Sequence, residues 1–205
     1  MYERILNESF QLFIQYGIRS ITMDDIAKHM GISKRTIYEN FRDKDDLLHA
    51  ALINHKKEQN RNIYAIISTT PNVLEAIYKV MYDFVNRLNQ INPTFFSDLQ
   101  KYHHKICQEL IPRQEEEHMK MLYDLIKKGI DESIFRNDIN IDIISRILNI
   151  QFKATSDEKL FPSGTFSRAD VFMNIIVNFT RGISTPKGIE IIDNLIETRK
   201  KNKNI

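Results

Sequence analysis

Apolar residues recur at intervals of three and four along almost the whole chain, which is the spacing that places side chains on one face of an α-helix. Near the start, Ile5, Leu6, Phe10, Phe13 and Ile14 keep this spacing until Gly17 interrupts it. Alternating apolar and polar runs joined by Asn-Gly or Asp-Gly turns, which would favour a sheet, do not occur in the sequence. The pattern therefore predicts an all-α protein.

Capping residues, glycines and prolines divide this pattern into separate helices. Thr22 and Asp25 have the spacing of a capping box at the start of a second helix, which Gly31 ends. Proline lacks the backbone amide that a helix interior needs, so a break is expected at Ile111–Pro112. After the second helix the expected helices cover 34–41, 45–64, 72–90, 93–110, 113–133, 141–155, 167–180 and 187–201.

The composition excludes several classes of protein. The chain has 205 residues, 42% of them hydrophobic, and a net charge of +2, so any affinity for DNA must come from a local patch of charge. The single cysteine, Cys107, excludes an intramolecular disulfide and a multi-cysteine zinc site, and no metal or cofactor is expected. There is no apolar run long enough for a membrane span and no signal-peptide core, so the expected location is the cytoplasm.

The segment around Gly31 meets the physical requirements of a helix-turn-helix motif. Gly31 can take the positive φ that a tight turn needs, and Ala27 is small enough for a close crossing of the two helices. Apolar side chains that would pin the helices together lie on both sides of the turn, at Ile26, Met30, Ile32 and Ile37. These requirements coincide within a short stretch, which indicates a DNA-binding motif.

The outward face of the third helix is polar and basic. Its side chains are Lys34, Arg35, Thr36, Tyr38 and Asn40, and Lys28, Arg42 and Lys44 lie nearby, offset by Glu39 and Asp43. Such a face suits the major groove of DNA, where cationic side chains reach guanine edges and phosphates. The alternatives are a solvated basic face and, for Tyr38, a surface tyrosine that packs on Lys34.

The first fifty residues resemble the N-terminal domain of the TetR (tetracycline-repressor-like) family. The similarity is carried, at fixed spacing, by Ile5-Leu6, Ser9-Phe10, Leu12-Phe13, Tyr16-Gly17, Ile21-Thr22, Ile26-Ala27, Gly31-Ile32-Ser33, Thr36-Ile37-Tyr38, Phe41, Lys44 and Leu47. The resemblance implies a helix-turn-helix DNA-binding domain over residues 1–46 and a helical effector-binding and dimerisation domain over 47–205.

The resemblance also implies roles for particular residues. Thr22 matches a position that caps the second helix and contacts phosphate, and Lys34, Arg35 and Thr36 match the start of the recognition helix. Tyr38 and Lys44 match residues that contact the DNA backbone. Many members of the family have glycine where this chain has Arg35 and histidine where it has Asn40, so the operator sequence cannot be inferred by analogy.

Two helices near the C-terminus are apolar on more than one side, which predicts a subunit interface. Only Asn174 and Asn178 interrupt the apolar surface of 171–179, and 143–152 has a similarly wide apolar face. Pairing with a second copy would give a four-helix interface in a homodimer, while a single buried helix in a monomer is the alternative. The expected interface residues are Ile144, Ile147, Leu148, Phe172, Ile175, Ile176 and Phe179.

Aromatic and polar residues between 78 and 123 are candidates for an effector pocket, although most aromatic residues at helical spacing belong to a core. The candidates are Tyr78, Tyr82, Phe96, Tyr102, His103, Cys107 and Tyr123. His103 and Cys107 are four residues apart and could share a metal or redox site, but no third ligand motif lies nearby.

Together these features predict a DNA-binding transcriptional regulator, a ligand-responsive repressor that binds a palindromic operator as a homodimer. The alternative is a helix-turn-helix regulator without a small-molecule effector, controlled by a protein partner. An enzyme is not expected, because the sequence has no phosphate-binding glycine loop, nucleophile elbow or metal-ligand cluster.

Overall fold

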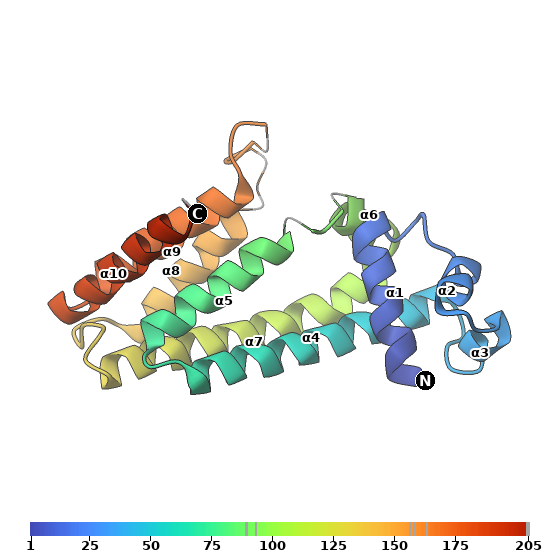
Figure 1. The fold of residues 1–205 in the computed structure, drawn as a ribbon, viewed down its shortest axis with the longest axis horizontal. Helices are drawn as coiled ribbons and strands as arrows, with labels where there is room; N and C mark the ends of the chain where they lie inside the picture. The colour runs from blue at the N-terminus through green and yellow to red at the C-terminus, as the bar shows by residue number, and fades with distance from the viewer. Residues whose placement is uncertain (89, 93, 156, 158, 163, 204–205) are drawn as a thin grey trace. The chain divides into compact units, whose positions relative to one another are not determined.

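The computed structural model describes residues 1–88, 90–92, 94–155, 157, 159–162 and 164–203. In these residues every regular element is a helix, apart from an isolated bridge between Phe135 and Ser184. The all-α prediction is therefore confirmed. In chain order (Figure 1) the helices are α1 (Tyr2–Tyr16), α2 (Met23–Met30), α3 (Lys34–Tyr38), α4 (Lys44–Thr69), α5 (Val73–Leu88), α6 (Thr94–Tyr102), α7 (His104–Asp131), α8 (Ile141–Ala154), α9 (Arg168–Ile183) and α10 (Pro186–Lys203).

The predicted break at Ile111–Pro112 is wrong. Helix α7 runs without interruption from His104 to Asp131 with Pro112 inside it, and the preceding break lies at His103 instead. A proline inside a helix removes one backbone hydrogen bond, and its ring crowds the carbonyl group four residues before it. A helix can still continue past a proline when packing on both sides offsets this cost. Ile106 and Leu110 before the proline and Leu122 and Ile126 after it are all buried.

By contacts between Cα atoms the chain divides into two compact units. Unit 1 consists of residues 1–64 and 89–113, and unit 2 of residues 65–88 and 114–205. Unit 1 thus includes residues beyond the DNA-binding domain predicted over 1–46. The predicted division at residue 46 is a division by function and stays a prediction. None of the helices in the described residues combines the length and the apolar character needed to cross a membrane.

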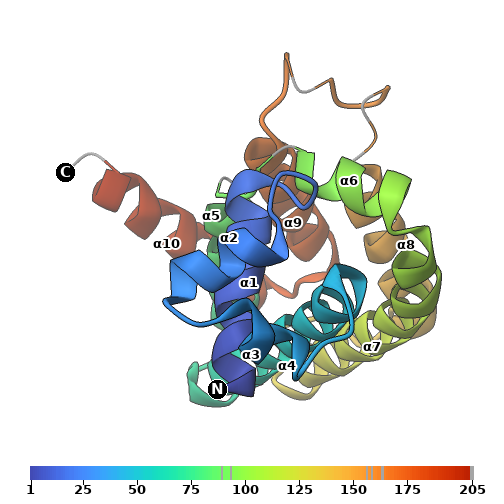
Figure 2. The ribbon, with the colours of Figure 1, turned by 90° about the vertical axis from the view of Figure 1, so that its right-hand side faces the viewer.

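Unit 1 is built around one apolar core to which α6 and α7 contribute as well as α1–α4. Figure 2 shows α1, α2 and α3 in front of α4, and α1 packs against both α2 and α6. Phe13, Ile26, Ile37 and Leu47 are fully buried. From the distant part of the sequence the same core receives Phe95, Ile106 and Leu110.

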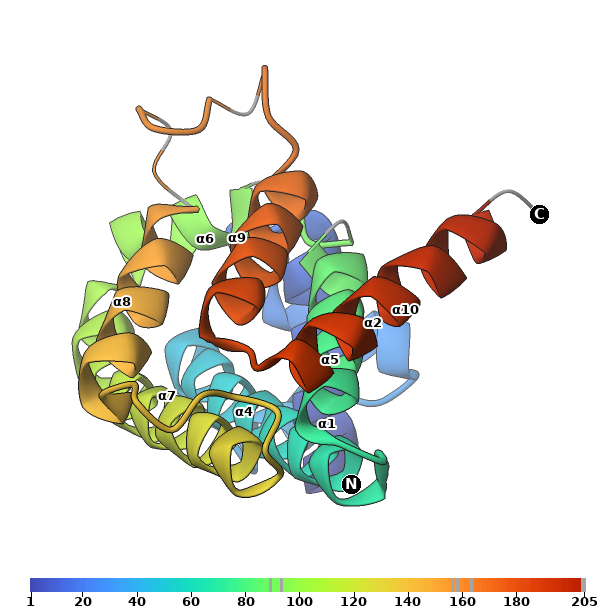
Figure 3. The same cartoon turned by 90° about the vertical axis from the view of Figure 1, so that its left-hand side faces the viewer.

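Unit 2 has its own core. In Figure 3, α9 lies between α8 and α5, and α10 packs on both α5 and α9. Phe172 of α9 stacks on Phe152 of α8 with the ring centroids 4.6 Å apart, and Phe84 of α5 lies 4.9 Å from Phe172. Aromatic contacts thus join three helices of this unit.

Candidate nucleic-acid interface

Helix α2 begins with a complete capping box. The amide of Asp25 donates to Thr22 Oγ1 over 3.2 Å, and the amide of Thr22 donates to Asp25 Oδ2 over 2.9 Å. These two bonds satisfy backbone donors that the first turn of a helix leaves free. The hydrogen bonds from the hydroxyl and the amide of Thr22 hold the pKa of the Asp25 carboxyl below its usual value. The predicted start of the second helix is confirmed.

The turn between α2 and α3 has the geometry that a helix-turn-helix requires. Gly31 ends α2 in the left-handed conformation, with φ 66° and ψ 33°, which other residues adopt only at a cost. Ser33 then caps α3 by accepting a hydrogen bond from the amide of Thr36. Ala27, Met30 and Ile37 are buried, so they fix α2 and α3 against the rest of the core. The structure thus contains the turn that the sequence predicts around Gly31.

Helix α3 is shorter than predicted and ends at Tyr38 rather than near Phe41. Asn40 closes this end, because its side-chain amide donates to the carbonyl oxygen of Thr36 over 2.9 Å. A side chain that bonds to the backbone in this way competes with the helical hydrogen-bond pattern. Lys34, Arg35, Tyr38 and Asn40 are all exposed, as a surface that reads DNA must be.

The exposed cations of α3 are paired with carboxylates. Lys34 Nζ lies 2.9 Å from Asp24 Oδ1 of α2, and Arg35 Nε lies 3.1 Å from Glu39 Oε1 at the end of its own helix. The hydrogen bond to Asp24 raises the pKa of Lys34. Lys34 Nζ also lies 5.8 Å from the centre of the Tyr38 ring. That contact agrees with the alternative in which Tyr38 packs on Lys34.

Lys44 is less exposed than Lys34 and Arg35. Its ammonium group donates to the carbonyl oxygen of Ile18, and it lies 5.9 Å from the centre of the Phe13 ring. Burial lowers the pKa of Lys44. Through this hydrogen bond Lys44, the first residue of α4, connects the start of that helix to the loop that precedes α2. To contact DNA, it would have to give up this bond or share it.

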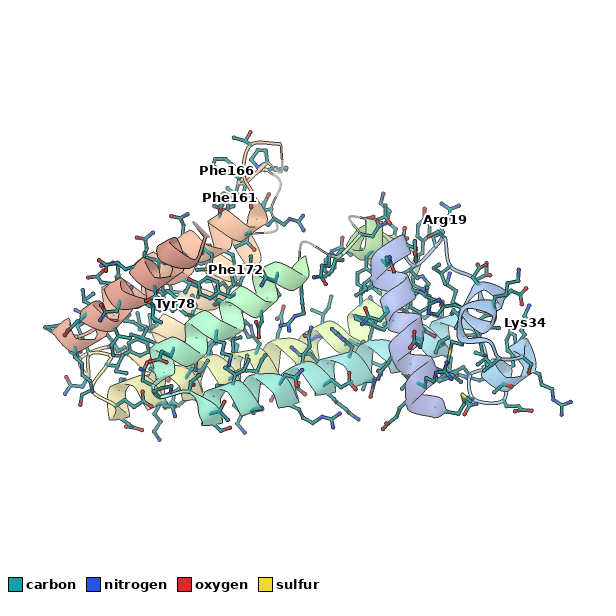
Figure 4. All side chains as sticks on the ribbon, viewed as in Figure 1. Arg19, Lys34, Tyr78, Phe161, Phe166 and Phe172 are labelled. Carbon is teal, nitrogen blue, oxygen red and sulfur yellow. The ribbon has the colours of Figure 1, made fainter. Side chains whose placement is uncertain are left out.

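Sequence reasoning missed a second group of contacts, around Arg19 in the loop between α1 and α2. The Arg19 amide donates to Asp98 Oδ2 over 3.0 Å, and its Nη1 donates to the Tyr102 hydroxyl over 3.2 Å. Figure 4 labels Arg19 in this loop, beside α6. These contacts join residues about eighty positions apart, which no local pattern reveals. The side-chain amide of Asn92 binds the carbonyl oxygen of Gln15 and supports the same junction.

The comparison with known families agrees with this geometry. The family signature described as "Bacterial regulatory proteins, tetR family" matches residues 5–51, which contain most of α1, all of α2 and α3 and the first turns of α4. The N-terminal part of the chain therefore belongs to the TetR family. That family is described as one of bacterial regulatory proteins.

Two curated relatives carry the similarity into the rest of the chain. The uncharacterized HTH-type transcriptional regulator YvaF of Bacillus subtilis (strain 168) is 36% identical over 107 residues, which are 51% of this chain and 55% of that protein. The HTH-type transcriptional repressor KstR2 of Mycobacterium tuberculosis (strain H37Rv) is 22% identical over 147 residues, 70% of this chain and 74% of that protein. The match to YvaF thus spans about half the length of that relative.

A solved structure extends the similarity of fold to most of the chain. The transcriptional regulator from Saccharomonospora viridis, in complex with choline, superposes with a TM-score of 0.62 at 17% identity. The match covers 90% of this chain and 97% of that one. At this identity the similarity establishes a shared fold.

The candidate pocket residues are divided between the two units of the chain. Tyr78, Tyr82 and Tyr123 belong to unit 2, whereas Phe96, Tyr102, His103 and Cys107 belong to unit 1. Several of them have other neighbours or face solvent. Tyr102 binds Arg19, His103 Nδ1 lies 2.9 Å from Asp45 Oδ1, and Phe96 is 43% exposed. Burial raises the pKa of the Cys107 thiol, and its Sγ lies 3.5 Å from the carbonyl oxygen of Leu99.

The structure distributes the candidate interface residues of α8 and α9 over two environments. Leu148, Phe172 and Ile176 are buried in the core of unit 2 within a single chain. Ile144, Ile175 and Phe179 are half-buried, and Ile147 is exposed. The exposed large apolar side chains of α8 are Ile143, Ile147 and Ile150. All three lie in the apolar face predicted over 143–152, and Ile147 is also among the expected interface residues.

Proposed function

We propose that this chain is a transcriptional repressor that binds a palindromic DNA operator as a homodimer in the cytoplasm and releases it when an effector binds. The observation that carries this proposal is the short, capped α3, which presents Lys34, Arg35 and Tyr38 to solvent after a left-handed turn at Gly31. A helix N-terminus with exposed cations can enter the major groove and contact base edges and phosphates.

Selection of fragments from the source genome by the purified protein, followed by footprinting, tests the DNA-binding part. The expected result is a two-fold symmetric footprint with half-sites about one helical turn apart. Binding that is purely nonspecific at physiological salt would contradict the proposal.

Single substitutions test the assigned roles. Tyr38→Ala and Lys44→Ala should weaken binding to all sequences, because both residues are proposed to contact the DNA backbone. Lys34→Ala and Arg35→Ala should change the preferred sequence, since base-edge contacts carry sequence information. A selection with each variant measures this, and an unchanged preference would remove that role from Lys34 or Arg35. Thr22→Ala tests the proposed phosphate contact at the start of α2.

The homodimer is supported by an apolar stripe on α8. Ile143, Ile147 and Ile150 are 55%, 41% and 64% exposed, and their spacing puts them on one face of the helix. Ile175 and Phe179 of the neighbouring α9 are half-buried against the core of unit 2, and in the proposed dimer a second copy of the chain would cover the rest of their surface. Burying such a stripe stabilises a dimer by about 25 cal/mol for each Å² removed from water.

The mass in solution tests this interface. The expected mass is twice the 24.2 kDa of the chain, and Ile147→Glu should reduce it to the mass of the monomer. Tyr64→Glu is the matched control, because Tyr64 is also an exposed apolar residue, 55% exposed, but lies on α4. An Ile147→Glu protein that stays dimeric would place the interface elsewhere.

An effector site in unit 2 is supported by buried polar atoms without a protein partner. Ser145 Oγ and Gln151 Oε1 on α8 are buried with no hydrogen bond within the described structure, and the buried Tyr78 hydroxyl on α5 lies near the side chain of Thr180. Burial raises the pKa of Tyr78. Buried polar atoms of this kind cost free energy unless another group satisfies them, and a ligand can be that group. The regulator from Saccharomonospora viridis was solved with choline, which makes choline a first compound to try.

A thermal-shift screen with choline and a panel of small metabolites tests for an effector. A true effector should raise the unfolding temperature and lower affinity for the selected operator, because binding energy must favour one of two states. Tyr78→Phe, which removes only the hydroxyl, should weaken the binding of the effector. The alternative, a regulator without a small-molecule effector, is favoured if only a protein from cell extract changes operator binding.

A further inference from the structure

Asp24 pairs with the first residue of the recognition helix from a different helix. Lys34 Nζ and Asp24 Oδ1 are 2.9 Å apart, and both side chains are about half exposed, 50% and 54%. Asp24 lies in the first turn of α2, between the buried Met23 and the capping residue Asp25. Its backbone is therefore fixed. Figure 4 labels Lys34 beside the two short helices α2 and α3.

The second pair, Arg35 with Glu39, is of a different kind. Both residues belong to the α3 segment at spacing i, i+4, and Arg35 is 89% exposed. An exposed pair of this type is weak, and both partners are free to rotate away from each other. Lys34 is more constrained, because the ring of Tyr38 lies near it as well as the carboxylate of Asp24.

We propose that Asp24 is a positioning residue that determines how well the protein discriminates its operator from other DNA. The proposal rests on the proposed function, in which Lys34 contacts a base edge. The Asp24 carboxylate holds the Lys34 ammonium at one place and repels phosphates around it. Lys34 therefore contributes little to the affinity for DNA that offers it only phosphates. An operator with a hydrogen-bond acceptor at the right base compensates for the loss of the Asp24–Lys34 ion pair.

The physical basis is the difference between phosphate attraction and base readout. Nonspecific binding comes almost entirely from cations that neutralise phosphates and release counterions. A lysine already paired with a carboxylate adds no net charge to this attraction, and the carboxylate opposes it. Specificity often depends on such a repulsive element, because it penalises the wrong partner more than the right one.

The test compares wild-type protein with Asp24→Asn on two duplexes of equal length, the selected operator and a random sequence. Fluorescence anisotropy gives the affinities over a range of salt concentrations. In Asp24→Asn, the freed Lys34 should add about one phosphate contact on random DNA. The slope of log affinity against log salt concentration should therefore steepen by about 0.9 for random DNA, and the affinity for random DNA at 0.15 M salt should rise about fivefold. Operator affinity should stay the same or fall, so discrimination should decrease about fivefold or more.

Three further variants separate positioning from folding and from total charge. Asp24→Glu keeps the carboxylate and should restore discrimination. Asp124→Asn makes the same chemical change at an exposed position of α7 in unit 2 and should behave as wild type. In a Lys34→Gln background, Asp24→Asn should no longer add a lysine–phosphate contact, so its effect on the salt slope should be much smaller. This double comparison remains informative if Asp24→Asn unfolds more easily.

The outcomes are distinguishable. If wild-type protein binds both duplexes equally, the proposed function fails. If wild-type protein discriminates but Asp24→Asn leaves the salt slope on random DNA unchanged, or tightens binding to both duplexes equally, the role of Asp24 is overturned. A steeper slope on random DNA together with lower discrimination supports it.

Discussion

Gly31 and Gly182 show how a glycine's backbone conformation decides its contribution to stability. Gly31 has φ 66°, and a Cβ there would meet nothing within 4 Å, so the cost of another residue is conformational alone. Gly182 lies in α9, and a Cβ there would also meet open space. Gly31→Ala should therefore lower the free energy of unfolding by about 1–2 kcal/mol.

Gly182→Ala is the matched control. It should raise the free energy of unfolding by up to about 1 kcal/mol, because alanine favours a helix interior more than glycine does. Urea unfolding followed by circular dichroism measures both variants. Equal effects of the two substitutions would contradict this explanation.

Asp25 should contribute stability that depends on pH. Its carboxyl has a pKa below the usual 3.8 because of the hydrogen bonds from the hydroxyl and amide of Thr22. A lowered pKa in the folded state stabilises the protein above pH 3.8, and this stabilisation is lost as the pH falls through the folded value. The difference in melting temperature between wild type and Asp25→Asn should be largest near neutral pH and shrink below pH 3.8.

Circular dichroism melts between neutral and acidic pH measure this difference, with Asp124→Asn as the control for loss of one surface carboxylate. A difference that does not change with pH would assign the effect of Asp25→Asn to packing.

The interactions at single residues that could be predicted from sequence are those between near neighbours. Thr22 and Asp25 are three residues apart, so their capping box follows from spacing. The pair Asp24–Lys34 depends on the crossing of α2 and α3, and the Arg19–Asp98 contact depends on the packing of α6. Neither crossing is encoded in a local pattern, so both contacts were found only in the structure.

At the scale of elements, the backbone near the end of α7 approaches an aromatic ring closely. A Cβ on Gly129 would lie 2.1 Å from Cδ2 of Phe135, whose ring is 2% exposed and has no room to move. Gly129→Ala should therefore force Phe135 from its place and lower the free energy of unfolding by about 1–3 kcal/mol. Urea unfolding tests this, and Phe135→Leu in the same background should recover part of the loss, because a smaller side chain leaves room for the new methyl group.

Helix boundaries were predictable where a cap or a glycine determines them, and less so at proline. The end of α2 follows from Gly31, whereas Pro112 was expected to end a helix and does not. The sequence shows that Pro112 lacks a backbone N–H group. It does not show that buried residues on both sides keep the helix continuous. The pocket candidates stay a prediction, and helical spacing alone does not tell which unit an aromatic residue belongs to.

At the scale of the whole molecule, the helices of the proposed DNA-binding domain share their core with a distant segment. Phe95 of α6 is 3% exposed and makes an edge-on contact with Phe10 of α1, the ring centroids being 6.2 Å apart. Phe95→Ala should therefore lower the free energy of unfolding of unit 1 by about 3–5 kcal/mol. Amide hydrogen exchange should become faster in α1 and stay unchanged in α9 of unit 2.

Phe96→Ala is the matched control, because its side chain is 43% exposed. It should have a much smaller effect on exchange in α1. Similar exchange in α1 for both variants would mean that α6 does not support the DNA-binding helices.

The discontinuous sequence of unit 1 has a consequence for synthesis on the ribosome. Residues 1–64 leave the ribosome before Phe95, Ile106 and Leu110, which complete their core. At about 5–20 residues per second, the chain needs roughly 2–10 s to add the segment up to residue 113. During this interval the nascent chain exposes the apolar surface around Phe10, and chaperones that bind such surfaces have time to act on it.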